Sequence, residues 1–342
     1  MTLLALETSC DETSAAVVRD GVVLSNVVSS QIKLHSEYGG VVPELATREH
    51  LKNLPRVFKD ALREANVRPD KLDAMAATQG PGLPAALTVG LKAAQAAAFA
   101  LGKPFLGLNH HEAHLYSPWI WGEPLRAHFE EFQPNVSLIV SGGHTLLVHV
   151  EAELKHHVLG STIDDAAGEC FDKVGKLIGL PYPGGPEMDR LAQAGDAARF
   201  DFPRPKLHDA DDDFSFSGLK TSVRYFLRDN PKLLEDAEVV RDLCASVQSA
   251  IVEVLVTKTT RAAKRLGVRC VTASGGVTVN RKLREELARV CDEQSFTLRL
   301  ADRAVCTDNA AMIGILAEHK FRRGAEATSL DADIAPGLAL AG

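Results

Sequence analysis

The chain has 342 residues, of which 45% are hydrophobic and 24% are charged. This length and composition exclude a disordered or fibrous protein and favour about two globular domains. With 38 basic and 45 acidic residues the net charge is −7, which excludes an overall positive field for binding nucleic acid or a membrane surface. Any contact with nucleic acid must therefore depend on local basic patches.

Cysteine usage and the first residues of the chain indicate a reducing compartment. The six cysteines lie far apart and form no C-x-x-C pair, which favours free thiols over a disulfide framework. The start, Met1–Glu7, lacks the basic region of a signal peptide. The most apolar helical pattern, Pro84–Leu101, contains Lys92 and Gln95 and is shorter than the roughly 20 residues of a membrane span. We therefore expect a cytoplasmic protein that does not bind a membrane.

Short apolar, β-branched runs alternate with helical patterns along the chain, which is typical of parallel strands joined by helices. In chain order, the predicted strands are Leu3–Leu6, Val22–Val28, Ala74–Thr78, Pro104–Leu108, Val136–Val140, Leu146–Val150, Arg269–Ala273 and Phe296–Leu300. The predicted helices are Glu44–Ala65, Pro84–Leu101, Asp165–Ile178, Ser246–Leu266, Asn280–Val290 and Asn309–Arg323. The first two strands are expected to pair as a hairpin in a mixed sheet. The pattern predicts an α/β protein.

Two of these strands end in similar turns. Ser141-Gly-Gly follows one strand and Ser274-Gly-Gly follows another, and a polar segment, Thr8–Thr13, follows the first strand. Glycine turns at strand ends let backbone N–H groups approach a ligand. The three turns predict a nucleotide cleft between two related lobes. We expect these to be residues 1–130 and 131–342, the second with an inserted loop and helical region at about 160–240.

The strongest local signal is a pair of histidines, His110 and His114. If this stretch is helical, the two imidazoles lie on one face, four residues apart, and can share a metal ion. Asp308, just before the last predicted helix, is the candidate third ligand because a carboxylate suits a hard or borderline ion. The alternative is that both histidines only cap or pack.

Residue spacing argues against two other chemistries. A zinc peptidase needs H-E-x-x-H, but Glu112 is two residues after His110 and lies about 200° around a helix from it, which disfavours a metallopeptidase. Gly80–Ala85 matches a dinucleotide fingerprint, but no acidic residue follows at the required distance, so a turn and helix start are expected. Asp11 and Glu12 are the candidate acid/base pair, with turn or helix capping as the alternative.

Eight ordered blocks resemble the bacterial family of tRNA threonylcarbamoyladenosine-forming transferases. The blocks are Glu7–Ser14, His110 with His114, Val140–Thr145, Asp164–Lys173, Tyr182–Pro186, Phe214–Lys220, Ala273–Val277 and Cys306–Asn309. The resemblance extends from residue 1 to about residue 325. It implies the two-lobed α/β fold of actin, sugar kinases and acetate kinase, with a nucleotide cleft between two related lobes.

The resemblance also implies a reaction. A threonylcarbamoyl group passes from threonylcarbamoyl-adenylate to N6 of the adenosine adjacent to the anticodon, in tRNAs that read codons beginning with A, and AMP leaves. One metal ion, Fe²⁺ with Zn²⁺ as the alternative, would be held by His110, His114 and Asp308. Asp11 or Glu12 would accept a proton from the attacking amine. The residues implied to bind the adenylate are Ile139, Val140, Ser141, Gly142, Gly143, Asp172, Gly185, Asp189 and Asn280.

The implied protein partners are a smaller paralogue of the same fold and a P-loop ATPase. Two other functions fit this fold: a non-catalytic scaffold, or an ATPase in the same complex. A scaffold would be expected to have lost metal ligands, whereas all three are present, and an ATPase should act on the γ-phosphate of ATP. These considerations favour a metal-dependent transferase.

Overall fold

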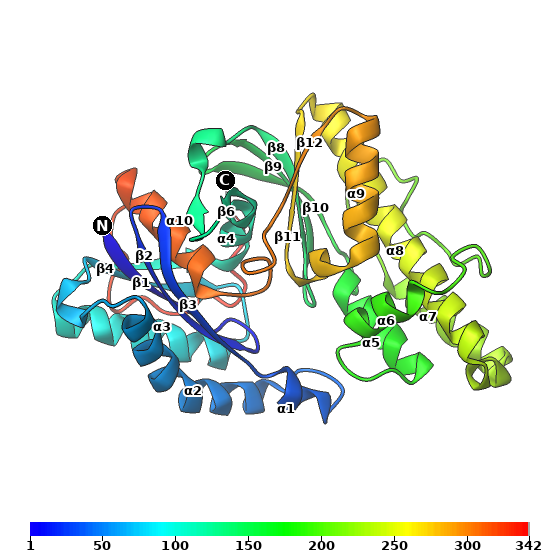
Figure 1. Cartoon of the computed structure of the whole chain (residues 1–342), viewed down its shortest axis with the longest axis horizontal. Helices are drawn as coiled ribbons and strands as arrows, with labels where there is room; N and C mark the ends of the chain where they lie inside the picture. The colour runs from blue at the N-terminus through cyan, green and yellow to red at the C-terminus, as the bar shows by residue number, and fades with distance from the viewer. Residues whose placement is uncertain (341–342) are drawn as a thin grey trace. The chain divides into compact units, whose positions relative to one another are not determined.

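The computed structural model describes residues 1–340, which divide into two units (Figure 1). Unit 1 consists of Met1–Phe132 and Ala301–Leu340, and unit 2 contains Gln133–Leu300. The expected first boundary, at residue 130, lies close to this division. The expected second lobe, 131–342, differs because residues 301–340 return to unit 1, where helix α10 (Ala310–Arg322) packs against β1 and β2.

Unit 1 is built on a mixed seven-stranded sheet in the order β5-β4-β1-β2-β3-β7-β6. Its strands are β1 (Thr2–Glu7), β2 (Glu12–Arg19), β3 (Val22–Ser30), β4 (Ala74–Gly80), β5 (Phe105–Asn109), β6 (Ile120–Trp121) and β7 (Arg126–Ala127). Strands β1, β4 and β5 are parallel, whereas β1, β2 and β3 form an antiparallel meander. The remaining helices are α1 (Ile32–Ser36), α2 (Pro43–Glu64), α3 (Pro84–Leu101) and α4 (His110–Tyr116).

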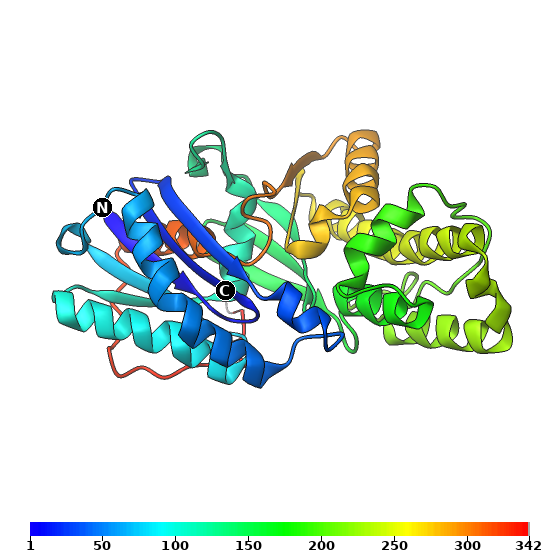
Figure 2. The same cartoon turned by 60° about the horizontal axis from the view of Figure 1, so that its bottom comes forward.

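Helices cover both faces of this sheet because its central strands are apolar on both sides. Leu4 and Leu6 of β1 belong to the core cluster formed with α2 and α3, which lie side by side in Figure 2. Ala5, which points the opposite way, packs against Gly314 of α10. Helix α3 is long and apolar enough to cross a membrane, but here its buried side packs against α2 and β4, as in the core helix of a globular domain.

Unit 2 repeats the same strand plan. Its five-stranded sheet has the order β10-β9-β8-β11-β12, which corresponds to β3-β2-β1-β4-β5 of unit 1 in order and direction. The strands are β8 (Asn135–Val140), β9 (Thr145–Ala152), β10 (Lys155–Ser161), β11 (Cys270–Ser274) and β12 (Thr297–Leu300). The helices are α5 (Ala167–Ile178), α6 (Gly184–Ala192), α7 (Ser217–Asp229), α8 (Ala237–Leu266) and α9 (Arg281–Glu293). The repeated plan agrees with the predicted pair of related lobes.

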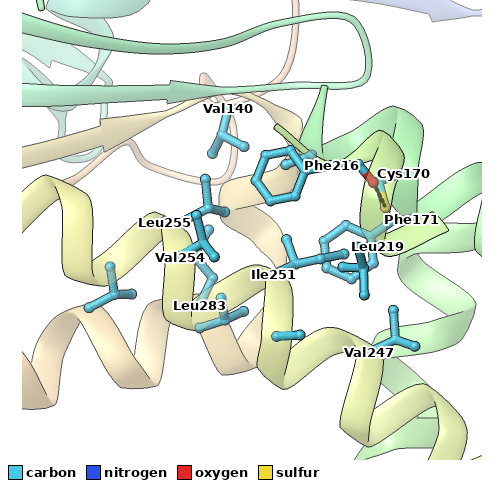
Figure 3. Close-up of a cluster of buried hydrophobic side chains, with 14 of the residues drawn as sticks. Val140, Cys170, Phe171, Phe216, Leu219, Val247, Ile251, Val254, Leu255 and Leu283 are labelled. Atoms are coloured by element: carbon cyan, nitrogen blue, oxygen red, sulfur yellow. Dashed lines mark hydrogen bonds between the residues drawn. The ribbon is translucent and has the colours of Figure 1, made fainter. Parts of the chain in front are cut away.

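The core of unit 2 lies between its sheet and these helices. Figure 3 shows Ile251 and Leu255 of α8 among the side chains of this cluster, with Phe171 and Phe216 close by. Helix α8 is capped by Asp236, whose carboxylate accepts a hydrogen bond from the Glu238 N–H, and it ends at Gly267. The helix is 30 residues long and starts nine residues before the predicted Ser246.

Every predicted strand and helix is present, but the predicted hairpin is wrong. Strand β2 lies between β1 and β3 and pairs with both. Its sequence contains Ala15 and Ala16, which are weak strand formers, so local propensity did not indicate it. Both alanines are fully buried, which shows that packing on the two sheet faces stabilises this strand. The elements α1, β6, β7, β10, α6 and α7 were also missed, although α6 and α7 lie within the inserted loop and helical region expected at about 160–240.

Candidate functional site

The histidine pair lies on a short helix with a defined start. The Asn109 side chain caps α4, because its Oδ1 accepts hydrogen bonds from the N–H groups of His111 at 2.9 Å and Glu112 at 3.1 Å. The predicted helical spacing is therefore confirmed, and the rings of His110 and His114 lie 4.8 Å apart at an angle of 86°. Both side chains are buried.

Asp308 comes to the same place from the turn before α10. Its Oδ1 lies 3.3 Å from His110 Nε2 and 3.2 Å from His114 Nε2. One ligand atom from each of these residues lies within 4.8 Å of the others. Two imidazole nitrogens and one carboxylate oxygen suit Fe²⁺ or Zn²⁺ and leave coordination positions for other ligands. The three residues selected from the sequence thus form one compact donor set within unit 1.

Glu7, at the end of β1, orients this donor set. The fully buried carboxylate accepts hydrogen bonds from the Ser9 N–H and the Thr78 hydroxyl, both at 2.5 Å. Its Oε2 also lies 2.9 Å from His110 Nδ1, so a proton on Nδ1 leaves Nε2 free to bind a metal. No role for Glu7 was assigned from the sequence, although an acidic residue ending a wholly apolar strand was a usable signal.

Burial and the neighbouring charges shift the pKa values of this cluster in opposite directions. Burial acts to lower the pKa of His110, but the carboxylates of Asp308 and Glu7 raise that pKa well above its usual range. Burial acts to raise the pKa of Asp308, but His110 and His114 hold it well below its usual range. Burial also lowers the pKa of His114, which keeps that imidazole neutral. These directions favour two ionised carboxylates, one imidazolium and one neutral imidazole in the cluster.

This balance predicts that metal binding releases a proton. Because the pKa of His110 is raised, the metal-free site carries a proton at neutral pH that a metal must displace, so metal affinity should increase with pH until His110 loses its proton unaided. Calorimetric titration in buffers of different ionisation enthalpy should detect release of about one proton per metal near pH 7. Proton release that stays at zero across neutral pH would contradict this assignment.

A second prediction concerns Glu7. The Glu7→Gln substitution places an amide NH₂ opposite one of three hydrogen-bond donors, so it should lower metal affinity by about 10- to 100-fold. Chelator competition measures that affinity. Thr78→Ser is the matched control because it keeps the hydroxyl that donates to Glu7. Equal affinities of Glu7→Gln and the unchanged protein would show that Glu7 does not orient His110.

Glu112 takes no part in the donor set. Its carboxylate forms an ion pair with Lys320 of α10 at 2.6 Å and is buried. A metallopeptidase needs this residue type beside the metal as a general base. The structure therefore agrees with the sequence-based argument against peptidase chemistry.

The acidic pair lies where the turn after β1 meets β2: Asp11 ends the turn and Glu12 is the first residue of β2. His50 of α2 braces this turn, with Nε2 2.9 Å from the Cys10 carbonyl and Nδ1 2.8 Å from the Thr13 hydroxyl. Burial and then the charges of Asp11 and Asp308 raise the pKa of Glu12 well above its usual range. The contribution from Asp308 indicates that the pair lies near the metal-binding residues.

The predicted adenylate residues lie in unit 2, where two strand ends meet. β8 and β11 are parallel neighbours, with Ile139 paired to Ser274, so their Gly-Gly turns leave the same edge of the sheet. Gly275 has φ of +92°, and a Cβ atom there would lie 2.4 Å from the Val140 carbonyl oxygen. Ile139 and Val140 are fully buried in β8, which pairs with both β9 and β11, so of the predicted adenylate segment only the turn that follows them reaches the surface. Gly142 has open space where a Cβ would be.

The other predicted adenylate residues form two linked pairs. Asp172 Oδ1 accepts hydrogen bonds from the N–H groups of Gly184 at 2.8 Å and Gly185 at 3.2 Å, at the start of α6. Asp189 Oδ2 accepts from the Arg281 N–H at 3.2 Å, next to Asn280, whose side chain caps α9. Asp189 Oδ1 is buried without a hydrogen-bond partner among the described residues. Asp189 also lines a cavity of about 150 Å³ with Gln248 and Arg281.

Solved structures share the whole fold. HypF from T. kodakarensis matches with a TM-score of 0.61 at 14% identity, over 94% of this chain and 48% of that chain. Component A of the (R)-2-hydroxyglutaryl-CoA dehydratase of Acidaminococcus fermentans matches with a TM-score of 0.55 at 13% identity, over 94% of this chain and 98% of that chain. These likenesses confirm the predicted fold class, a two-lobed actin-like α/β protein.

Sequence comparison identifies the family. A model of the family described as tRNA N6-adenosine threonylcarbamoyltransferase matches residues 22–315. The protein of that name from Geobacter metallireducens is 50% identical over 97% of this chain and 96% of its own length. The one from Salinibacter ruber is 49% identical over 99% of this chain and 100% of its own length. The chain therefore belongs to the family of tRNA N6-adenosine threonylcarbamoyltransferases.

Proposed function

We propose that this protein transfers the threonylcarbamoyl group of threonylcarbamoyl-adenylate to N6 of the adenosine adjacent to the anticodon, in tRNAs that read codons beginning with A. The amine attacks the carbamoyl carbon, a C–N bond forms, the bond from that carbon to the phosphate oxygen breaks, and AMP leaves. The observation that carries the proposal is the match, at 50% identity over 97% of the chain, to a transferase of this name.

His110, His114 and Asp308 would hold one metal ion, Fe²⁺ or Zn²⁺. The donor set supports this assignment because its three ligand atoms converge and because Glu7 fixes the tautomer of His110. When bound, the ion would polarise and orient the substrate. The full presence of these ligands argues against a scaffold that has lost catalysis.

Asp11 is the residue we assign as acceptor of the proton from N6. Burial and the charge of Asp11 raise the pKa of Glu12 well above its usual range, which favours the protonated form of Glu12 and leaves Asp11 as the better proton acceptor. Because N6 is a weak nucleophile, correct positioning of the amine and the donor should contribute as much as the base.

Unit 2 would bind the adenylate part of the donor. The unpartnered Asp189 Oδ1 can accept a hydrogen bond from a ribose hydroxyl. The adjoining Gly-Gly turns expose backbone N–H groups suited to a phosphate. Asp172 would act through Gly184 and Gly185, by fixing the start of α6, in addition to any direct contact.

We further propose that the protein works in the cytoplasm with a smaller paralogue of its own fold and a P-loop ATPase. The net charge of −7 supports a requirement for partners, since their basic residues would supply part of the field that attracts tRNA.

The proposal is tested by reconstitution. The protein is combined with both partners, unmodified tRNA and labelled threonylcarbamoyl-adenylate, and modified adenosine and AMP are quantified. Equal amounts of the two products support transfer. Release of phosphate from the γ-position of ATP by this protein alone, without modified adenosine, would favour the ATPase alternative. No product in a system where an active relative succeeds would favour the scaffold.

A further inference from the structure

Residues 325–340 form a continuous set of contacts with unit 1. Residues 325–340, here called the C-terminal strap, contain no regular helix or strand. The strap begins at the open edge of the sheet, where the Thr328 N–H donates to the Phe105 carbonyl at 2.7 Å. It then passes α3, where Lys92 and Gln95 donate to the Ala332 carbonyl at 3.0 and 2.8 Å. Figure 2 shows this red segment running beside α3.

The strap next crosses the end of β4. The Ala335 N–H donates to the Gln79 carbonyl at 2.9 Å, and the Gly82 N–H donates to the Pro336 carbonyl at 3.2 Å. A Cβ atom on Gly80 would lie 1.8 Å from the Ala335 carbonyl oxygen, so only glycine allows this approach. The first residues of Gly80–Ala85, the motif that matches a dinucleotide fingerprint, therefore contact the C-terminal strap.

The strap ends on Asn109. The Asn109 Nδ2 donates to the Leu338 carbonyl at 3.2 Å and the Ala339 carbonyl at 3.0 Å. The same side chain caps α4 through Oδ1, one residue before His110. The buried amide thus joins the strap to the first turn of the helix that carries both histidines.

We propose that Asn109 is a positioning residue, which couples the C-terminal strap to α4 and so sets the geometry of the His110 and His114 donors. The inference rests on the proposed metal site. An amide is required because one group must accept from two N–H groups and donate to two carbonyls at once. Residues outside the donor set that fix its geometry typically change metal affinity by about 10- to 100-fold.

The experiment separates capping from attachment of the strap. Asn109→Ser keeps an N-cap oxygen and adds no charge, but it removes the donor to the strap. A second variant ends at Pro336 and removes the two carbonyls while keeping the Pro336 contact with Gly82. The control, Lys92→Ala, removes an exposed contact in the middle of the strap and leaves Asn109 intact.

Three measurements are made on each variant: Co²⁺ affinity from its visible absorption, hydrogen exchange of the His111 and His114 region, and the thermal unfolding midpoint. Asn109→Ser and the shortened chain should each bind Co²⁺ about tenfold more weakly, with faster exchange in α4. The combined variant should be no weaker than either alone, because both changes break the same link. The control should bind as the unchanged protein does.

Two outcomes would overturn the inference in distinguishable ways. If the unchanged protein binds Co²⁺ and both variants bind it equally well, the strap does not position the donors, and the metal site stands. If the unchanged protein binds no Co²⁺, or His114→Ala binds as tightly, the metal site fails and the inference fails with it.

Discussion

Replacing His110 and His114 together by Ala should abolish metal binding and lower threonylcarbamoyl transfer by about 10²-fold or more, because several kcal/mol of transition-state stabilisation would be lost. The two imidazoles supply two of the three donor atoms, and Asp308 alone cannot hold a divalent ion with comparable affinity. Metal content is measured by elemental analysis and transfer by the yield of modified adenosine in the reconstituted system.

A second variant distinguishes the loss of metal binding from a folding defect. The double substitution leaves Glu7 buried beside the space vacated by His110, which costs stability. Asp308→Asn keeps the shape of the side chain and should still bind metal much more weakly. His128→Ala is the control, since His128 belongs to a separate, more exposed group with Glu130 and Glu131. Full transfer by a folded, metal-free Asp308→Asn protein would exclude a role for the metal.

Replacing Gly275 by Ala should strongly destabilise unit 2, because this position combines a positive φ with a close approach of backbone. The residue has φ of +92° and ψ of 157°, a conformation that only glycine adopts readily. The added Cβ would also lie 2.4 Å from the Val140 carbonyl oxygen, so the strand ends of β8 and β11 must move apart. Backbone strain and overpacking together predict a loss of about 2–5 kcal/mol in the free energy of unfolding.

Gly267→Ala provides the comparison for this change. Gly267 also has a positive φ, +68°, but a Cβ there would meet nothing within 4 Å. The difference between the two variants in denaturant midpoint measures the combined cost of the close approach and of the more strained backbone at Gly275. Gly275→Ala should in addition weaken binding of a non-hydrolysable adenylate analogue, because the Gly-Gly turns shift. Equal midpoints for the two variants would refute the packing argument.

The elements that local pattern indicated are those with clear periodicity. The strand at Val136–Val140 and the helix at Pro84–Leu101 were predicted because apolar residues dominate both segments at the spacing of a strand or a helix. β2 was missed because its alanines have little intrinsic preference for a strand, and its conformation depends on neighbours that are remote in sequence. α6 was missed because its glycines and prolines indicated a loop, whereas Asp172 fixes its first turn.

The metal-binding cluster likewise contains residues that the sequence indicated and one residue that it did not. The spacing of His110 and His114 is a property of one helix, so the sequence was sufficient to pair them. Asp308 is remote from both histidines in sequence, and its carboxylate chemistry indicated it as their partner. The contribution of Glu7 could not be read from spacing, because it depends on β1, β4 and α4 meeting at one point.

The sequence by itself determined the α/β class, the histidine pair, the similar glycine turns and the family, because these depend on residues close together or on ordered motifs. Tertiary structure alone decided that residues 301–340 return to unit 1, that Glu7 holds His110 and that Asn109 holds the end of the chain. These contacts join residues separated by about a hundred positions or more, and their free energy arises only when the sheet has brought its strand ends together.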